Sequence, residues 1–376
     1  MIRVIIYTPG ELAQSSYAHT GFFELEEQKY LKCYVKLRFK RELGTLQVIK
    51  SRIEYSKRPN PKTSYYDIKI RKSKVIKIAI DLDDNPSRFS KYALKNCEYI
   101  FKRNFQNRYI NQLSIDYKKK IFPFGITSGC ISNKRHSMMK IYLGLLIYLC
   151  SINIKIDNLF FSRLKTIFIN FKNNYTFDKN NINIEKYRNI NLGKKKEQVF
   201  YQTRCFKDDS DIETRSLHEY RNKLISQLKI NLKDKFKGGF LKSNESLINY
   251  RNNISNIKSE DYYNEIANSQ ITVYSNGLKT SPAWKLFEYL SRGNAIIAEK
   301  FQFELPYKLD DNKHLIYYND PNDCGLKARK LIGNKEKIYF LSKNANDFFK
   351  KYVDPMQNIK RIINFIIERE KRSNSY

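Results

Sequence analysis

The chain of 376 residues is strongly basic, with 70 Lys and Arg against 38 Asp and Glu and a formal net charge of +32. Its 41% hydrophobic and 14% aromatic content is typical of a folded, soluble protein and excludes a disordered chain. The length predicts two domains, each with its own core. The charge indicates a negative partner, such as nucleic acid, anionic lipid or a phosphorylated substrate. The alternative is compositional drift, because Lys, Asn, Ile and Tyr are frequent together, as an A/T-rich genome would produce.

The sequence also excludes several enzyme classes. It contains no P-loop, no G-x-G-x-x-G motif, no serine nucleophile elbow and no zinc-ligand spacing. Six cysteines are scattered without a C-x-x-C pair, which fits a reducing compartment. The first residues, MIRVIIYTPGE, lack the layout of a signal peptide and predict a first strand. We therefore expect a cytoplasmic protein.

The positive charge is concentrated between residues 117 and 196. This region has sixteen Lys and Arg against three acidic residues, and it overlaps the most apolar run, Met138 to Ile154. That run is short for a membrane span and contains Lys140, so it predicts a buried or membrane-surface helix. Basic residues beside exposed apolar ones suit an anionic membrane surface, and we expect peripheral binding on the inner face of the membrane.

Val4 to Tyr7 is the first predicted strand, and a loop is expected from Thr8 to Thr20. In open α/β domains the loops after strand ends carry the site, and this loop contains Glu11 and His19. His19 is a candidate general base toward an acceptor hydroxyl, because the unperturbed pKa of histidine is near neutral. The alternative, a surface or helix-capping histidine, is the commoner role for such a residue.

Val75 to Ile80 predicts a buried strand that ends in Asp81-Leu82-Asp83-Asp84. Carboxylates at a strand end can hold a metal, act as a base or cap the next helix. Capping is the commoner role, and Asp83 is kept as a candidate base. Asn158 to Lys196 has no clean periodicity and is interpreted as the end of the first domain plus a linker.

The second domain is expected to begin with a strand at Val199 to Tyr201. Arg204 and Lys207 follow its carboxyl end, where a cation can stabilise charge on a departing diphosphate. The alternative for Arg204 is an exposed arginine, which is common in so basic a chain. Helices and strands then alternate, beginning with a long amphipathic helix from Ile212 to Leu232.

The segment Ser275 to Glu299, SNGLKTSPAWKLFEYLSRGNAIIAE, predicts a loop, a helix, a tight turn and a strand. Ser281 is expected as the N-cap and Pro282 as the first helical residue. Backbone N–H groups at this helix start, after the loop at Gly277, would bind an anion, best a phosphate.

Glu288 lies two helical turns after Ser281, on nearly the same face. A carboxylate there can accept hydrogen bonds from sugar hydroxyls while a phosphate is held at the helix end. The alternative is an ordinary amphipathic helix with Trp284, Phe287 and Leu290 in a core and Glu288 in solvent.

This segment resembles the donor site of glycosyltransferases with the GT-B fold, in particular the bacterial family-1-like and CgeB-like enzymes of surface-polysaccharide synthesis. The likeness lies in Lys285-Leu286-Phe287-Glu288-Tyr289-Leu290, followed by Gly293 and the strand Ala295 to Ala298. It extends upstream to Phe200-Tyr201-Gln202-Thr203-Arg204. It is good over Val199 to Pro355 and weaker before that.

The resemblance implies a metal-independent GT-B glycosyltransferase that uses a nucleotide-diphosphate sugar, a UDP-sugar as first choice. It implies a cell-surface glycan or lipid-linked acceptor, no cofactor and no specific nucleic acid. It also implies two Rossmann-like α/β domains facing across a cleft, with an acceptor domain at 1–195 and a donor domain at 196–353. A crossover helix and tail at 354–376 would return to the first domain. Many retaining members have a further glutamate where this chain has Thr280, which puts a retaining mechanism in doubt.

The expected catalytic residues are His19, Asp83 and Arg204, and no metal ligands are expected. The expected donor-binding residues lie in the second domain: Arg204, Lys207, Gly277, Thr280, Ser281, Ala283, Lys285 and Glu288. Two other functions stay open at this point. One is a catalytically degenerate GT-B partner subunit, which Thr280 favours. The other is a basic nucleic-acid-binding protein, for which only the charge and the tyrosines speak.

Overall fold

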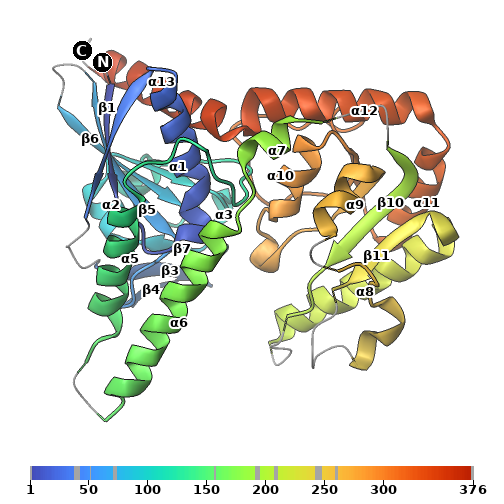
Figure 1. Ribbon diagram of the computed structural model, residues 1–376, viewed down its shortest axis with the longest axis horizontal. Coiled ribbons are helices and arrows are strands. Elements are labelled where there is room, and N and C mark those ends of the chain that lie inside the picture. The colour runs from blue at the N-terminus through green and yellow to red at the C-terminus, as the bar shows by residue number, and fades with distance from the viewer. Residues whose placement is uncertain are drawn as a thin grey trace. The chain divides into compact units, whose positions relative to one another are not determined.

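The computed structural model describes residues 2–37, 43–50, 52–70, 74–155, 158–190, 195–206, 211–241, 248–258 and 261–373. The chain divides into two compact units (Figure 1). Unit 1 contains Met1–Glu185, Phe303–Pro306 and Asp354–Tyr376. Unit 2 contains Lys186–Gln302 and Tyr307–Val353. Each unit combines a β-sheet with helices, so the expectation of two α/β units is confirmed.

Unit 1 is built on a six-stranded sheet in the order β2-β1-β5-β6-β8-β9. In that order its strands are Leu31–Lys36, Ile2–Tyr7, Thr63–Ile70, Val75–Asp81, Tyr99–Lys102 and Ile121–Pro123. Strand β5 is antiparallel to both β1 and β6, and the other pairs are parallel. A three-stranded sheet joins β4 (Arg52–Ser56), β3 (Thr45–Ile49) and β7 (Arg88–Ser90). The short helices are α2 (Lys91–Asn96), α3 (Asn107–Ile110), α4 (Ile115–Lys118) and α7 (Ile184–Arg188), where the chain passes to unit 2.

Helix α1 (Leu12–Glu27) packs against the C-terminal helix α13 (Pro355–Ser373) in unit 1. Gly21 permits this contact, because a Cβ there would lie 2.4 Å from the carbonyl oxygen of Pro355. The Nδ2 of Asn358 donates to the Tyr17 hydroxyl and to the Phe124 carbonyl, both at 3.2 Å. The expected return of the last helix to the first domain is therefore confirmed.

Helix α1 begins well before the sequence predicted. The loop expected from Thr8 to Thr20 is wrong, because the helix starts at Leu12 and includes His19. Twelve of its sixteen residues are buried, serine, threonine and histidine among them. A helix buried on most sides shows little amphipathic contrast, which is why its first turns were taken for a loop.

Helices α5 (Met138–Asn153) and α6 (Phe160–Lys179) form a hairpin (Figure 1). Helix α6 belongs to unit 1, in line with the interpretation of residues 158–196 as the end of the first domain plus a linker, but the helix itself was not predicted. Only Ile167 and Asp178 of α6 are buried, so the helix has too few core positions to show a period. Among the described residues, no helix combines the length and the apolar character needed to cross a membrane.

Unit 2 contains a parallel sheet in the order β11-β10-β12-β13-β14. In chain order its strands are β10 (Lys196–Thr203), β11 (Phe236–Phe240), β12 (Ser269–Tyr274), β13 (Ala295–Glu299) and β14 (Ile316–Tyr318). The helices are α8 (Ile212–Leu232), α9 (Tyr262–Asn268), α10 (Trp284–Ser291), α11 (Pro321–Ile332) and α12 (Lys335–Phe348). The predicted long helix from Ile212 to Leu232 is confirmed in type and in both bounds.

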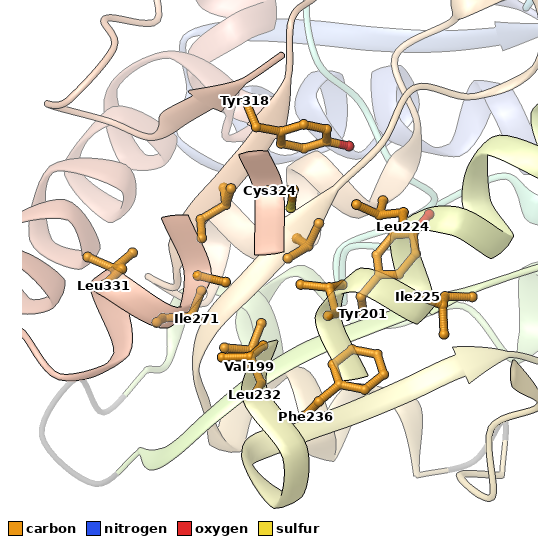
Figure 2. Close-up of a cluster of buried hydrophobic side chains, with 14 of the residues drawn as sticks. Val199, Tyr201, Leu224, Ile225, Leu232, Phe236, Ile271, Tyr318, Cys324 and Leu331 are labelled. Carbon is orange, nitrogen blue, oxygen red and sulfur yellow. The ribbon is translucent and has the colours of Figure 1, made fainter. Parts of the chain in front are cut away.

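The core of unit 2 lies between the sheet and the helices α8 and α11. Val199 and Tyr201 of β10 pack in this core with Leu224 of α8 and Cys324 of α11 (Figure 2). Since side chains alternate along a strand, Phe200 points to the opposite face, where it contacts Tyr262 with 5.8 Å between ring centroids. Burial of both faces holds the carboxyl end of β10 in a fixed place.

We predict that Gly21→Ala lowers the free energy of unfolding by about 1–2 kcal/mol. The added methyl overpacks the contact between α1 and α13 by more than the roughly 1 kcal/mol that alanine gains over glycine in a helix. Gly333→Ala is the matched control, because no atom lies within 4 Å of the position of its Cβ. Urea unfolding of both variants measures the effect, and a Gly21→Ala protein as stable as the wild type would contradict the packing.

Candidate functional site

The strand order of unit 2 locates a candidate site. The chain goes from β10 outward to β11 and then crosses to the other side of β10 to form β12. In open parallel sheets, ligands bind beyond the carboxyl ends of the strands where the order reverses in this way. The loops that begin at Arg204, after β10, and at Ser275, after β12, therefore border the site.

Arg221 of α8 connects these two loops. Its Nη1 donates to the Arg204 carbonyl at 3.1 Å, and its Nη2 donates to the Asn276 carbonyl at 3.2 Å. The residue is 5% exposed, and its Nε is buried without a hydrogen-bond partner among the described residues. Its hydrogen bonds to neutral carbonyls leave the guanidinium charged, and this charge acts on Lys285 and on the carboxyl of Glu299.

Lys285 of α10 places a second cation at the end of β10. Its Nζ donates to the Gln202 carbonyl and lies 5.2 Å from the centroid of the Tyr201 ring. Burial lowers the pKa of Lys285 well below its ordinary value, and the charges of Arg221 and Arg204 lower it further. The exposed Arg204 is thus the third cation of this group. Because a bound anion would relieve their mutual repulsion, the three side chains are a candidate anion site.

The start of α10 differs from the prediction. Ser281 is not the N-cap and Pro282 is not helical, because the helix begins at Trp284 with Ala283 as its N-cap. An alanine side chain has no atom that can cap the helix, so the first amides need other partners. The Ala283 N–H itself donates to the Tyr274 hydroxyl at 3.0 Å.

The loop before α10 contains two strained residues. Lys279 and Thr280 have φ of +57° and +54°, in the left-handed region that side chains disfavour. Glu213 of α8 holds the loop in this shape, since it accepts from the Lys279 backbone N–H at 2.9 Å and from its Nζ. The Gly277 N–H donates to the Ser281 carbonyl at 2.9 Å and closes the turn. Backbone strain of this kind is concentrated in ligand-binding loops.

Glu288 of α10 is buried, with 4% of its surface exposed, so the alternative of a solvated Glu288 is wrong. The Tyr262 hydroxyl donates to its Oε2 at 2.8 Å. Burial raises the pKa of Glu288, while the hydrogen bond from Tyr262 and the charges of Lys285 and Arg204 lower it. The carboxylate therefore faces two of the three cations from a desolvated position.

The structure brings Arg204, Lys285 and Glu288 within range of one another's charges. The adjoining loop contains the other expected donor-binding residues that are described: Gly277, Thr280, Ser281 and Ala283. Lys207 lies outside the described residues. The expected catalytic residues His19 and Asp83 belong to unit 1.

His19 lies in the core of unit 1. It is 5% exposed, and its ring contacts those of Phe23 and Tyr66 at centroid distances of 6.4 and 6.0 Å. Its Nε2 is buried without a hydrogen-bond partner among the described residues. Burial lowers the pKa of His19 to about 4. The expected alternative of a surface or capping histidine is wrong, and the burial also speaks against a base that must reach an acceptor.

Asp83 is held by its neighbours. It accepts from Arg88 at 2.6 and 3.0 Å and from Asn60 at 3.1 Å, and it is 1% exposed. Burial raises the pKa of Asp83, but the hydrogen bond from Arg88 and the charges of Lys102 and Arg88 together bring the pKa below its ordinary value. A carboxylate paired in this way suits a structural role better than proton transfer.

Glu11 is the remaining candidate base in unit 1. It is the N-cap residue of α1, but its side chain makes no capping hydrogen bond. Burial raises the pKa of its carboxyl, and the charges of Lys62 and Asp84 act on it in opposite directions. The partly buried carboxyl follows β1 at the carboxyl edge of the sheet, where loops carry the sites of open α/β domains.

The sequence prediction missed Arg221 and Tyr262. Arg221 comes three residues before Leu224 and four before Ile225, on the buried stripe of α8. A charged residue on an otherwise apolar stripe was the available signal, because burial of a charge requires a compensating partner. Tyr262 had no such signal in the sequence.

Among the residues that the structure describes, no three His, Cys, Asp or Glu are grouped as they would be around a metal ion. Comparison with protein-family models gives no match, and no curated protein matches the sequence.

Several solved structures are similar at low identity. A TarM variant of S. aureus, in complex with fondaparinux, α-GlcNAc-glycerol and UDP, has a TM-score of 0.38 at 12% identity, covering 97% of this chain and 99% of that one. Anabaena HepE with UDP has a TM-score of 0.37 at 11% identity, covering 72% and 79%. A protein of Listeria monocytogenes described as a UDP-N-acetylglucosamine 2-epimerase has a TM-score of 0.34 at 11% identity. The match covers 73% of this chain and 60% of the Listeria protein. None of the three bears on the CgeB-like subtype, which stays a prediction.

We predict that His19 makes the protein less stable as the pH falls from about 6.5 to about 4. Its pKa is about 4 in the folded chain, so only the unfolded chain binds the extra proton in this window. The contribution of neutral His19 to the free energy of unfolding is fully present above about pH 6.5. Between about pH 6.5 and about pH 4, about 3 kcal/mol of it is lost.

The measurement is the free energy of unfolding of the wild type and of His19→Phe across this range. The free energy of unfolding of the variant should fall by about 3 kcal/mol less than that of the wild type across this range, because the other titrating groups are the same in both proteins. An equal decline in both proteins would show that His19 is not buried in its neutral form.

Proposed function

We propose that the protein is a glycosyltransferase that moves a sugar from a nucleotide-diphosphate sugar, in the first instance a UDP-sugar, to a glycan or lipid-linked acceptor. The observation that carries the proposal is the group of three cations at the switch point of unit 2: Arg204, Arg221 and Lys285. A nucleoside diphosphate gains negative charge as its bond to the sugar breaks. Fixed cations at that point stabilise the charge without a metal.

In this proposal, Lys285 and Glu288 bind different parts of the donor. Lys285 meets the diphosphate, together with the amides and the dipole at the start of α10. Glu288 lies one turn later on the same helix, where Tyr262 fixes its carboxylate at 2.8 Å. We assign Glu288 to the hydroxyls of the ribose or of the transferred sugar. In the absence of a donor, it balances part of the charge of Lys285 and Arg204.

For the general base we propose Glu11 instead of His19 and Asp83. His19 is enclosed by aromatic rings, and Asp83 is neutralised by Arg88. Glu11 is partly buried at a strand end, and burial raises the pKa of its carboxyl, the direction that favours accepting a proton. The acceptor would then bind at this edge of unit 1. A cytoplasmic location is part of the proposal, since none of the six cysteines forms a disulfide with another described residue.

We predict that one nucleotide of a panel of UDP, GDP, ADP, CMP and dTDP raises the melting temperature of the wild type at physiological salt. A ligand that binds only the native state stabilises it by mass action. Lys285→Gln should weaken this binding at least tenfold, because hydrogen bonds to charged groups contribute about 1.5–3 kcal/mol. Glu288→Gln should weaken it too, since the neutral amide accepts hydrogen bonds from hydroxyls less strongly.

The control is Lys335→Gln, which removes an equal charge at an exposed position of the same unit. The same response in Lys285→Gln and the control would place the nucleotide away from the switch point. If no nucleotide of the panel stabilises the wild type, the glycosyltransferase proposal fails.

We predict that Glu11→Gln lowers the rate of sugar transfer by about 10²–10⁴-fold, the usual contribution of a general base. Stabilisation by the nucleotide should stay unchanged, because Glu11 belongs to the other unit. Glu27→Gln, at the exposed end of α1, is the control. If the Glu11→Gln enzyme transferred sugar at the wild-type rate, Glu11 would not be the general base.

A further inference from the structure

We propose that the α5–α6 hairpin docks unit 1 onto the surface of an anionic lipid bilayer. Of the 21 large hydrophobic side chains that are exposed among the described residues, ten lie between residues 139 and 169. This region is a small part of the chain, so the exposure is concentrated there. Contiguous apolar side chains in solvent mark an interaction surface.

On each helix, three of the exposed apolar side chains lie along one stripe. On α6, Phe161, Leu164 and Phe168 follow at helical spacing and are 82%, 38% and 66% exposed. On α5, Met139, Leu143 and Leu146 repeat the same spacing. A stripe of this kind would form a core if it were covered, and here it faces solvent on both helices.

The charge on the described part of the hairpin is mostly positive. Exposed lysines accompany both stripes: Lys140, Lys155, Lys165 and Lys172. No Asp or Glu lies among the described residues of 138–177. Asp178, at the end of α6, is buried and bonds to Arg135 at 2.7 Å, so it offsets none of the exposed charge. Apolar side chains flanked only by lysine are typical of helices that lie in the interface of an anionic bilayer.

The charge also decides between a bilayer and a second copy of the chain. Two copies that met through this face would bring like charges together, which opposes association. A bilayer with anionic headgroups offers apolar depth for the phenylalanines and negative charge for the lysines. We therefore commit to the bilayer as the occupant.

The hairpin is joined firmly to the rest of unit 1. Gly144 lets α5 approach the loop after β1, since a Cβ there would lie 2.3 Å from the Thr8 side chain. The Tyr142 hydroxyl of α5 donates to Asp178 of α6 at 2.7 Å and links the two helices. Docking would thus hold the loop that contains Glu11 close to the membrane. The inference does not rest on the proposed function, because it concerns binding to lipid alone.

The first test is co-flotation of the full chain with vesicles of phosphatidylcholine, with and without phosphatidylglycerol. We expect binding to the anionic vesicles, weakened as salt is raised from about 0.1 to about 0.5 M. Phe161→Asp with Phe168→Asp should lower the partition coefficient at least tenfold, since each buried aromatic contributes about that factor. Both residues are exposed, so the melting temperature should stay that of the wild type.

Two matched controls separate docking from general stickiness. Tyr339→Asp with Phe340→Asp changes two exposed aromatic residues of α12, which are 59% and 46% exposed, and should leave binding unchanged. Lys165→Gln with Lys172→Gln should weaken binding more than Lys343→Gln with Lys350→Gln, although both pairs leave the same net charge.

Three results would overturn the inference. The first is absence of binding to anionic vesicles. The second is equal binding by the two lysine double variants, which would indicate attraction by net charge only. The third is self-association of the wild type in sedimentation that Phe161→Asp with Phe168→Asp abolishes, which would make a second copy the occupant.

Discussion

The arrangement of unit 2 depends on one buried guanidinium. Arg221 reaches from α8 to the backbone on both sides of the switch point, at the Arg204 and Asn276 carbonyls. These bonds fix the two loops that any ligand of the site must meet. The pKa of Lys285 falls through its burial and through the charge of Arg221, which also acts on the carboxyl of Glu299. In the proposed function these fixed groups would meet an anion without rearranging, which is the condition under which fixed charges contribute most to binding and catalysis.

Part of the net charge of +32 belongs to basic residues with a proposed role, and the rest reflects the composition of the chain. Many surface lysines are ordinary, such as Lys119 beside Asp116. Two groups differ from these. At the switch point two of the three cations, Arg221 and Lys285, are desolvated, and on the hairpin the lysines accompany exposed apolar side chains. Composition alone explains neither the burial of Arg221 and Lys285 nor the apolar stripes of the hairpin.

The sequence predicted the elements whose burial follows a clear period. Helix α8 has a buried stripe and solvent on its other side, so both of its ends were found. The strand after α10 was found because Ala295–Glu299 is almost wholly buried. Helices α1 and α6 were missed or misplaced for opposite reasons, since one is buried on most sides and the other on few. Two units and the returning helix were predictable, but the arrangement of the units across a cleft stays a prediction.

For the site, the sequence located the right segment and got its local geometry wrong. Arg204, Lys285 and Glu288 do share one electrostatic neighbourhood. The expected Ser-Pro helix start failed because Tyr274, a residue of the preceding strand, takes the Ala283 amide. Propensity rules for caps describe local contacts, and here a tertiary contact replaces the local one. The same limit applies to Asp83, whose role depends on Arg88 and Asn60.

The conformation of Thr280 bears on whether the site is degenerate. A chain that had lost its function would be expected to relax a loop that no ligand needs. Lys279 and Thr280 instead keep left-handed backbones, each at a cost of about 1–3 kcal/mol. Glu213 holds them there through the Lys279 backbone and side chain, so the strain is opposed by a dedicated contact from another helix. A strained loop supported in this way is consistent with the proposed donor site, in which Thr280 takes the place of a carboxylate.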